Sequence, residues 1–317
     1  MDPAPRDARA GLRCAVDWGL FALTLLSTGA VLGFSFLSAS GTLTGYKIGA
    51  IAQLYESAIA PASWALRIWA VIYFLSALLS VAQFISLVVP IETLAPGGWM
   101  RATFGVKKDL VLRKVAPFWA AASVGNICWI VFFTLNTSAW TFALSSATIF
   151  ALLAALVVIY VNTKAWHALH TERDSILEVL VIEVLISMYT GWVAVACILS
   201  SAVTFIAFGW RGAPWTETGW VCVILTVAAL VEALNLATRR APIFAAVFSM
   251  SAAAIGARNG AESVAVLIVS VLLSVLFGCG ALVAAVAHSV KAVRRWRARP
   301  AVGDARTEDL LEEPSNP

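Results

Sequence analysis

Long apolar runs separated by short polar segments dominate this chain. A helix that crosses a membrane needs about 20 predominantly apolar residues, and eight runs approach or exceed that length. They cover residues 18–38, 68–89, 118–135, 140–161, 184–210, 219–236, 242–257 and 263–287. The pattern therefore predicts an all-α integral membrane protein with about eight transmembrane helices.

Composition supports the same fold class. Of the 317 residues, 61% are hydrophobic and only 13% are charged, whereas a soluble domain carries about 25% charged residues. No soluble core could bury so much apolar surface, so the bilayer must be the solvent. The first apolar run is longer than the 7–15 residues of a signal-peptide core, which favours a retained helix over a cleaved signal peptide.

The distribution of basic residues predicts the topology. If the N-terminus faces inside, all but four of the 22 Lys and Arg residues fall in inside segments; the exceptions are Lys47, Arg67, Arg211 and Arg258. This asymmetry is the positive-inside signal of multi-pass membrane proteins. The seventh run is short, but without it the basic C-terminal tail would lie outside. We therefore expect eight spans with both termini on the inside, cytoplasmic face.

The inside segment 91–116 combines apolar side chains (Trp99, Phe104, Leu110 and Val111) with several basic residues. Such a mixture is typical of a segment that lies along an anionic membrane surface. An ordinary solvated basic loop is equally consistent with it. Gly29 and Gly33 in the first run form a GxxxG spacing, which allows another helix to approach closely.

Ionisable side chains are absent from the middle of every predicted span, which argues against an ion-coupled pump. The deepest acids are Glu183 and Glu232, and we expect Glu232 to pair with Arg239 or Arg240. No nucleophile–base constellation is present, so the sequence does not predict an enzyme, and nothing in it points to nucleic acid.

Metal binding and glycosylation are also not expected. The five cysteines lack metal-like spacing, and a His167–His170 pair supplies only two ligands, so a solvated pair is the simpler interpretation. Asn136 begins a glycosylation sequon in a loop predicted to be too close to the bilayer for modification.

Three of the thirteen tryptophans, Trp69, Trp129 and Trp192, lie within spans instead of at their ends, where interfacial belts explain such residues. Asn126 and Trp129 lie three residues apart, as do Tyr189 and Trp192, so each pair shares a helix face. These side chains could line a pocket for a flat, apolar, conjugated ligand. Aromatic packing between helices is the alternative.

The same residues resemble signatures of one family. Pro61, Trp69 and Tyr73 are similar to its Pro-x7-Trp-x3-Tyr motif; Asn126 and Trp129, followed by Phe132-Phe133 and Trp140, are similar to its Asn-x-x-Trp motif; and Tyr189 with Trp192 is similar to its Tyr-x-x-Trp motif. The chain thus resembles the TspO/translocator-protein family of tryptophan-rich sensory proteins, in a longer branch with extra C-terminal spans.

This resemblance implies a five-helix bundle over residues 15–210. A tail (1–14) would precede it, and a three-helix extension (211–290) and a basic-then-acidic disordered tail (291–317) would follow. It also implies a frequent homodimer and a pocket beneath the loop between the first two helices. Ligands of the family include porphyrins and other tetrapyrroles, sterols and drug-like hydrophobic molecules. The implied pocket residues are Pro61, Trp69, Asn126, Trp129, Tyr189 and Trp192.

Arg67 is a further candidate for the site, because an outside-facing cation near the pocket entrance could meet a ligand carboxylate. An ion pair with Glu56 explains Arg67 equally well.

The sequence thus favours a multi-pass protein that binds a hydrophobic small molecule, with a tetrapyrrole as candidate ligand and no obligatory cofactor. Sensing or trafficking would be its role. An ion-uncoupled facilitator for a small solute and a membrane scaffold or assembly protein remain as alternatives.

Overall fold

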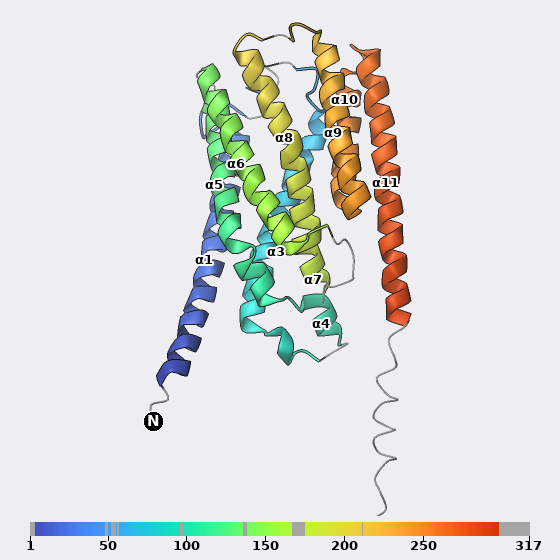
Figure 1. Cartoon of the computed structure of the whole chain (residues 1–317). Coiled ribbons are helices and arrows are strands. Elements are labelled where there is room, and N and C mark those ends of the chain that lie inside the picture. The colour runs from blue at the N-terminus through green and yellow to red at the C-terminus, as the bar shows by residue number, and fades with distance from the viewer. Residues whose placement is uncertain are drawn as a thin grey trace, which may run out of the picture.

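The computed structural model describes residues 4–47, 50–51, 55, 57–95, 98–135, 138–166, 175–210 and 212–297. Every regular element in these residues is a helix. The long helices are α1 (Ala4–Ser40), α3 (Ile68–Val88), α5 (Ala116–Leu135), α6 (Ala139–Thr163), α8 (Leu185–Ala207), α9 (Glu217–Arg239), α10 (Pro242–Asn259) and α11 (Val264–Arg297). They alternate in direction through the molecule (Figure 1).

Seven helical segments are long and apolar enough to cross a membrane. They correspond to seven of the eight predicted spans, and several boundaries agree within two residues, as for α3 and α5. The remaining predicted span, the seventh in chain order, is α10, which forms as predicted but has only 18 residues. Its smaller apolar content follows from its position, since it packs against α8, α9 and α11 and buries much of its surface on protein.

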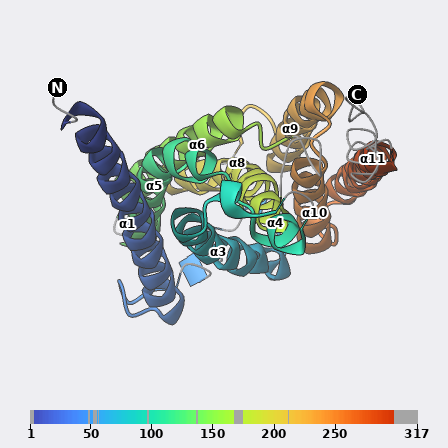
Figure 2. The same ribbon diagram turned by 90° about the horizontal axis from the view of Figure 1, so that it is seen from below.

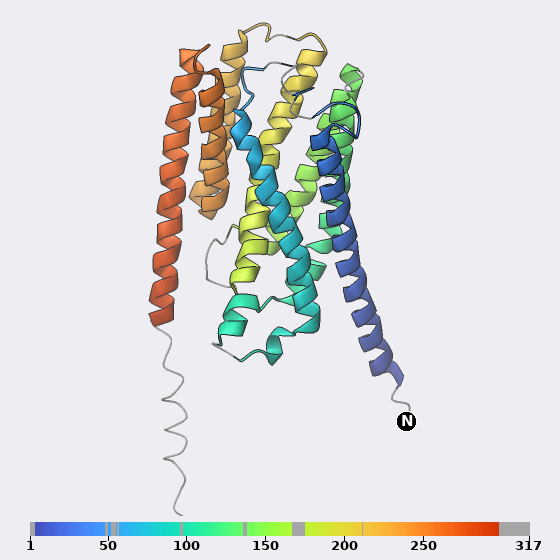
Figure 3. The same ribbon diagram turned by 180° about the vertical axis from the view of Figure 1, so that it is seen from behind.

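Helix α8 lies near the middle of the assembly. In the view from below, α1 and α11 lie at opposite ends and α8 lies between α6 and α3 (Figure 2). Buried residues make up 72% of the most apolar stretch of Ile176–Ala207, the segment that contains α8, against 17% in α1 and 22% in α11. From behind, α3 crosses diagonally in front of α8 (Figure 3). The central helix can therefore contribute side chains to an internal site.

Close helix contacts occur at small residues. A Cβ placed on Gly125 of α5 would lie 3.1 Å from Leu152 of α6, and one on Gly256 of α10 would lie 2.8 Å from Ser270 of α11. By contrast, Gly29 and Gly33 of α1 have nothing within 4 Å of such a Cβ. The GxxxG spacing in α1 therefore serves no helix contact within the described chain.

Two terminal segments are more helical than the sequence analysis predicted. Helix α1 begins at Ala4, not near residue 15, and α11 continues to Arg297, into the segment expected to be disordered. In α1, Asp17 is almost fully buried because Lys108 (2.9 Å) and Arg113 (3.3 Å) pair with its carboxylate. These ion pairs compensate the buried charge of Asp17 within α1.

The segment 91–116 is only partly a surface segment. It contains the short helix α4 (Trp99–Phe104) and a π-helical turn (Asp109–Arg113). Trp99 and Phe104 are exposed, as expected, but Leu110 and Val111 are buried in the core. Gln83 of α3 donates to the carbonyl of Val111 (2.8 Å), which draws that part of the loop inward.

The predicted ion pair of Glu232 with Arg239 or Arg240 is wrong. Glu232 is buried, and its carboxylate accepts a hydrogen bond from the Asn235 amide at 3.5 Å. The Arg239 guanidinium lies instead over the rings of Trp166 (4.9 Å) and Tyr160 (5.8 Å). Asn136, His167, His170, Glu56 and residues 298–317 lie outside the described residues.

A candidate ligand-binding cavity

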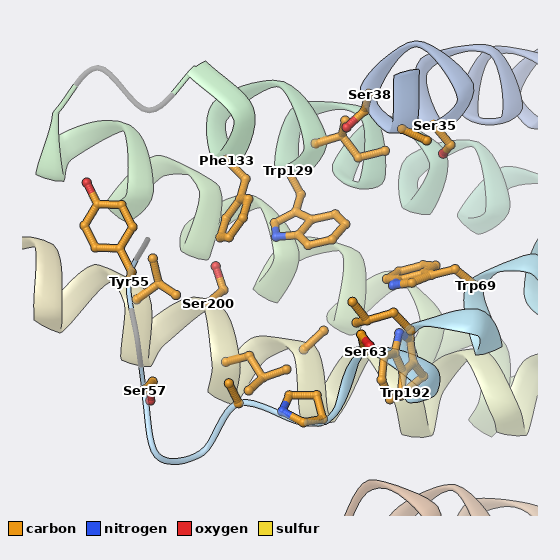
Figure 4. Close-up of a pocket in the computed structure, with 18 of the residues that line it drawn as sticks. Ser35, Ser38, Tyr55, Ser57, Ser63, Trp69, Trp129, Phe133, Trp192 and Ser200 are labelled. Atoms are coloured by element: carbon orange, nitrogen blue, oxygen red, sulfur yellow. The ribbon is translucent and has the colours of Figure 1, made fainter. Parts of the chain in front are cut away.

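A cavity of about 360 Å³ lies between α1, α3, α5 and α8. The end of α1 and the start of α3, which contribute to its lining, lie at the upper end of the molecule in the view of Figure 1. The 57–63 segment, which belongs to the connection between α1 and α3, forms one of its walls (Figure 4). Its lining residues are Ser35, Ser38, Ala39, Tyr55, Ser57, Ala60, Pro61, Ser63, Leu66, Trp69, Tyr73, Trp129, Ile130, Phe133, Trp192, Ala196, Leu199, Ser200, Val203 and Arg258.

The three tryptophans singled out in the sequence meet at this cavity. Trp69 stacks on Trp129, with ring centroids 5.6 Å apart and an interplanar angle of 23°. Trp192 presents its edge to Trp69 at 6.4 Å and 85°. Figure 4 shows all three rings beside the open space. Because they come from α3, α5 and α8, the fold itself assembles this aromatic surface.

Pro61 lies where the connecting segment turns into α3. It is buried against the cavity and precedes a short 3₁₀ helix (Ser63–Arg67) that leads directly into α3. Proline has no N–H to satisfy, and its fixed φ suits the entry to a helix. This geometry places Trp69 in the first turn of α3, facing the cavity.

Asn126 and Tyr189 lie close to the cavity but do not line it. The Asn126 amide donates a hydrogen bond to the Tyr189 hydroxyl, and both residues are buried. The Tyr189 ring contacts Trp69 at 6.0 Å and Trp119 at 5.9 Å, both edge to face. The structure thus places these two residues beneath the aromatic surface, where they hold α5 and α8 together and support Trp69.

The arginine among the lining residues is Arg258, not Arg67. Arg67 ends the 3₁₀ helix and is exposed. Arg258 comes from the last turn of α10, far along the chain. In the sequence it stood out only as one of the four basic residues that depart from the positive-inside pattern.

Several hydroxyl groups at the cavity were not anticipated. Ser35 and Ser38 come from α1, Ser57 and Ser63 from the connection, and Ser200 from α8. Ser200 contacts the Ser146 hydroxyl at 3.0 Å. A serine in an apolar helix is common, so sequence spacing alone does not identify those that face a cavity.

Some polar atoms at this cavity are buried without a partner. Within the residues that the structure describes, the indole nitrogens of Trp129 and Trp192 and the hydroxyl of Ser38 have no hydrogen-bond partner. A buried polar group without a partner costs free energy, about 1–3 kcal/mol. Such groups are uncommon in native structures, and these belong to residues that line the cavity.

A scan against family models matches residues 21–283 to the model described as TSPO-like protein. The match covers most of the chain. The protein belongs to this family. No curated protein and no solved structure gives a significant match to the chain.

Family membership and the seven apolar helices establish an integral, multi-pass membrane protein. The matched residues begin inside the first predicted span, contain the next four and reach into α11, so the family model also describes the C-terminal helices. Within the described residues, no group of three or more His, Cys, Asp or Glu side chains is placed to hold a metal ion.

Proposed function

We propose that this TSPO-like protein binds a flat, hydrophobic small molecule in the cavity between α1, α3, α5 and α8, for sensing or trafficking. The convergence of Trp69, Trp129 and Trp192 on one apolar cavity is the observation that carries this proposal. Aromatic faces stack on conjugated rings, and ligand pockets of about 300–1,000 Å³ are typically apolar with few polar groups. A tetrapyrrole or sterol-like ligand has the required character.

Binding is favoured over passage of a solute because the bundle is packed beneath the cavity. Asn126, Tyr189 and Trp119 are all buried there. The neighbouring void that Trp119 and Tyr189 line has a volume of only about 10 Å³, about the minimum needed for one water molecule. Among the described residues directly beneath the cavity, the space beside Trp119 and Tyr189 is therefore too small for a solute larger than water.

Orientation in the membrane belongs to the same proposal. The N-terminal end of α1 and the C-terminal end of α11 lie at the same end of the molecule, the lower end in Figure 1. The basic residues Lys107, Lys108, Arg113 and Lys114 lie in the 91–116 segment at that end. The positive-inside rule would place this end in the cytoplasm, so the cavity would open near the opposite surface.

A fluorescence titration tests the binding proposal. Protoporphyrin IX added to purified protein in detergent is expected to quench tryptophan emission saturably. Trp129→Ala and Trp192→Ala should each weaken the affinity about two- to tenfold, because each removes one aromatic contact.

Trp140→Ala serves as the matched control. Trp140 is exposed on α6, contacts Phe208 and does not line the cavity, so its loss should leave the affinity unchanged. Saturable binding that is indifferent to both cavity substitutions would reject this site.

A further inference from the structure

The last three helices hold the wall of the cavity in place. The Ala58 N–H donates to the Glu217 carboxylate of α9 (2.9 Å), and the Ala62 N–H donates to the Ala254 carbonyl of α10 (2.9 Å). The Asn259 side chain of α10 donates to the Ala60 carbonyl (2.9 Å). Three hydrogen bonds therefore tie one short segment, residues 58–62, to helices that follow it by more than 150 positions.

An apolar anchor reinforces these hydrogen bonds. Ile59 is 3% exposed and packs in a cluster with residues of α9, α10 and α11: Val221, Leu225, Ile255 and Val266. Its burial turns the neighbouring Ala60 and Pro61 towards the cavity, which they line. The C-terminal helices thus fix the position of the wall and do not merely lie beside the first five helices.

Helix α10 also provides the charge in the cavity. Arg258 lies next to Asn259 and is half-buried. In the part of the chain that the structure describes, its guanidinium has no ion-pair partner, and no lining residue is acidic. The other lining side chains are aliphatic, aromatic or hydroxyl-bearing. A single cation in a cavity that also contains the aromatic surface of Trp69, Trp129 and Trp192 complements a molecule that is flat, apolar and acidic at one edge.

We propose that Arg258 selects ligands that carry a carboxylate at the edge of a flat apolar body. This inference rests on the proposed binding function and names the ligand class for the same cavity. Guanidinium groups bind carboxylates through two parallel hydrogen bonds, which are stronger than bonds between neutral groups. The hydrogen bond from Asn259 to Ala60 and the burial of Ile59 hold the end of α10 that carries Arg258 against the 58–62 segment of the cavity wall.

The test compares an acid with its neutral ester. Wild-type protein in detergent is titrated with protoporphyrin IX and, separately, with protoporphyrin IX dimethyl ester, which keeps the ring system but lacks the negative charge. We expect the acid to bind about tenfold more tightly. Arg258→Gln should lower the affinity for the acid about tenfold and leave the affinity for the ester unchanged, so that the preference disappears.

Two further variants keep the outcome interpretable. Arg67→Gln removes an exposed arginine that does not line the cavity, and it should preserve the preference for the acid. Arg258→Lys keeps a positive charge and should retain part of the preference. These variants separate a local charge effect from a general change in surface charge or folding.

The outcomes distinguish the two proposals. Equal affinity of the wild-type protein for acid and ester, or an acid preference that survives Arg258→Gln, overturns the role of Arg258 while the cavity remains a binding site. Failure of both compounds to bind saturably to the wild-type protein overturns the binding function and the role of Arg258 with it.

Discussion

The indole of Trp69 lies almost parallel to the indole of Trp129, with ring centroids 5.6 Å apart. One ring comes from the first turn of α3 and the other from the third quarter of α5. The ring of Tyr73 also stacks on Trp69, with ring centroids 5.5 Å apart. An aromatic surface built from two helices forms only when the whole bundle is assembled, so the integrity of the cavity and that of the fold are linked.

The hydrogen bond between Asn126 and Tyr189 should stabilise the fold beneath this surface. Asn126→Ala is expected to lower the stability by about 1 kcal/mol, because it removes the donor to a buried hydroxyl. Thermal unfolding in detergent would measure the change as a lower transition temperature.

A double-mutant cycle with Tyr189→Phe isolates this bond from other effects. Polar pairs inside membrane proteins show coupling energies of about 0.6 kcal/mol, with a maximum of about 1.7 kcal/mol. The double variant should therefore lose less stability than the two single changes together. Strictly additive losses would mean that the hydrogen bond contributes nothing.

Loosening the cavity wall should accelerate ligand exchange. Asn259→Ala removes the hydrogen bond to Ala60 but leaves the contacts of Ala58 and Ala62. A hydrogen bond contributes about 0.5–1.5 kcal/mol, which corresponds to a dissociation rate about two- to tenfold faster. Stopped-flow recovery of tryptophan fluorescence after dilution of the porphyrin complex measures that rate.

Asn235→Ala is the control for this prediction. Asn235 lies near the C-terminal end of α9, away from Glu217, which contacts the wall, and its side chain contacts Glu232. The substitution should leave the dissociation rate unchanged. If both asparagine variants release the porphyrin at the wild-type rate, Asn259 does not hold the wall.

Accessibility to a membrane-impermeant maleimide tests the orientation and the crossing by α10. In a background without the native cysteines, Thr42→Cys should react in intact cells. Arg13→Cys and Lys291→Cys should react only after the membrane is permeabilised. If α10 did not cross, position 291 would react as position 42 does, and position 13 would not.

The number and position of the long helices could be predicted because apolar length is a property of the sequence itself. The ends of α1 and α11 could not be predicted in this way. A helix can continue beyond the bilayer when its polar residues are solvated or contact other parts of the protein, so the length of the apolar run does not determine where the helix ends. Asp17 illustrates this: its burial depends on Lys108 and Arg113, which lie about 90 residues away. Leu110 and Val111 were likewise drawn into the core by a contact with α3 that no local pattern reveals.

In the candidate site, too, some residues could be identified from local sequence patterns and others only from long-range contacts. Helical spacing and the family resemblance selected Trp69, Trp129 and Trp192, and the structure brings them together. Asn126 and Tyr189 were selected by the same motifs, yet they lie beneath the cavity. Arg258 was missed because its proximity to the cavity arises from the packing of α10 on α8 and on the 57–63 segment, which is a long-range property of the fold.

The central claim, that the cavity is a ligand site, is tested most directly by filling it. Ala196 of α8 lines the cavity, and a phenylalanine there would occupy the space where a ligand would stack. Ala151→Phe on the exposed face of α6 adds the same side chain away from the cavity. We expect saturable quenching by protoporphyrin IX to be lost in Ala196→Phe and retained in Ala151→Phe, while both variants unfold cooperatively. Undiminished saturable binding to folded Ala196→Phe would contradict the account.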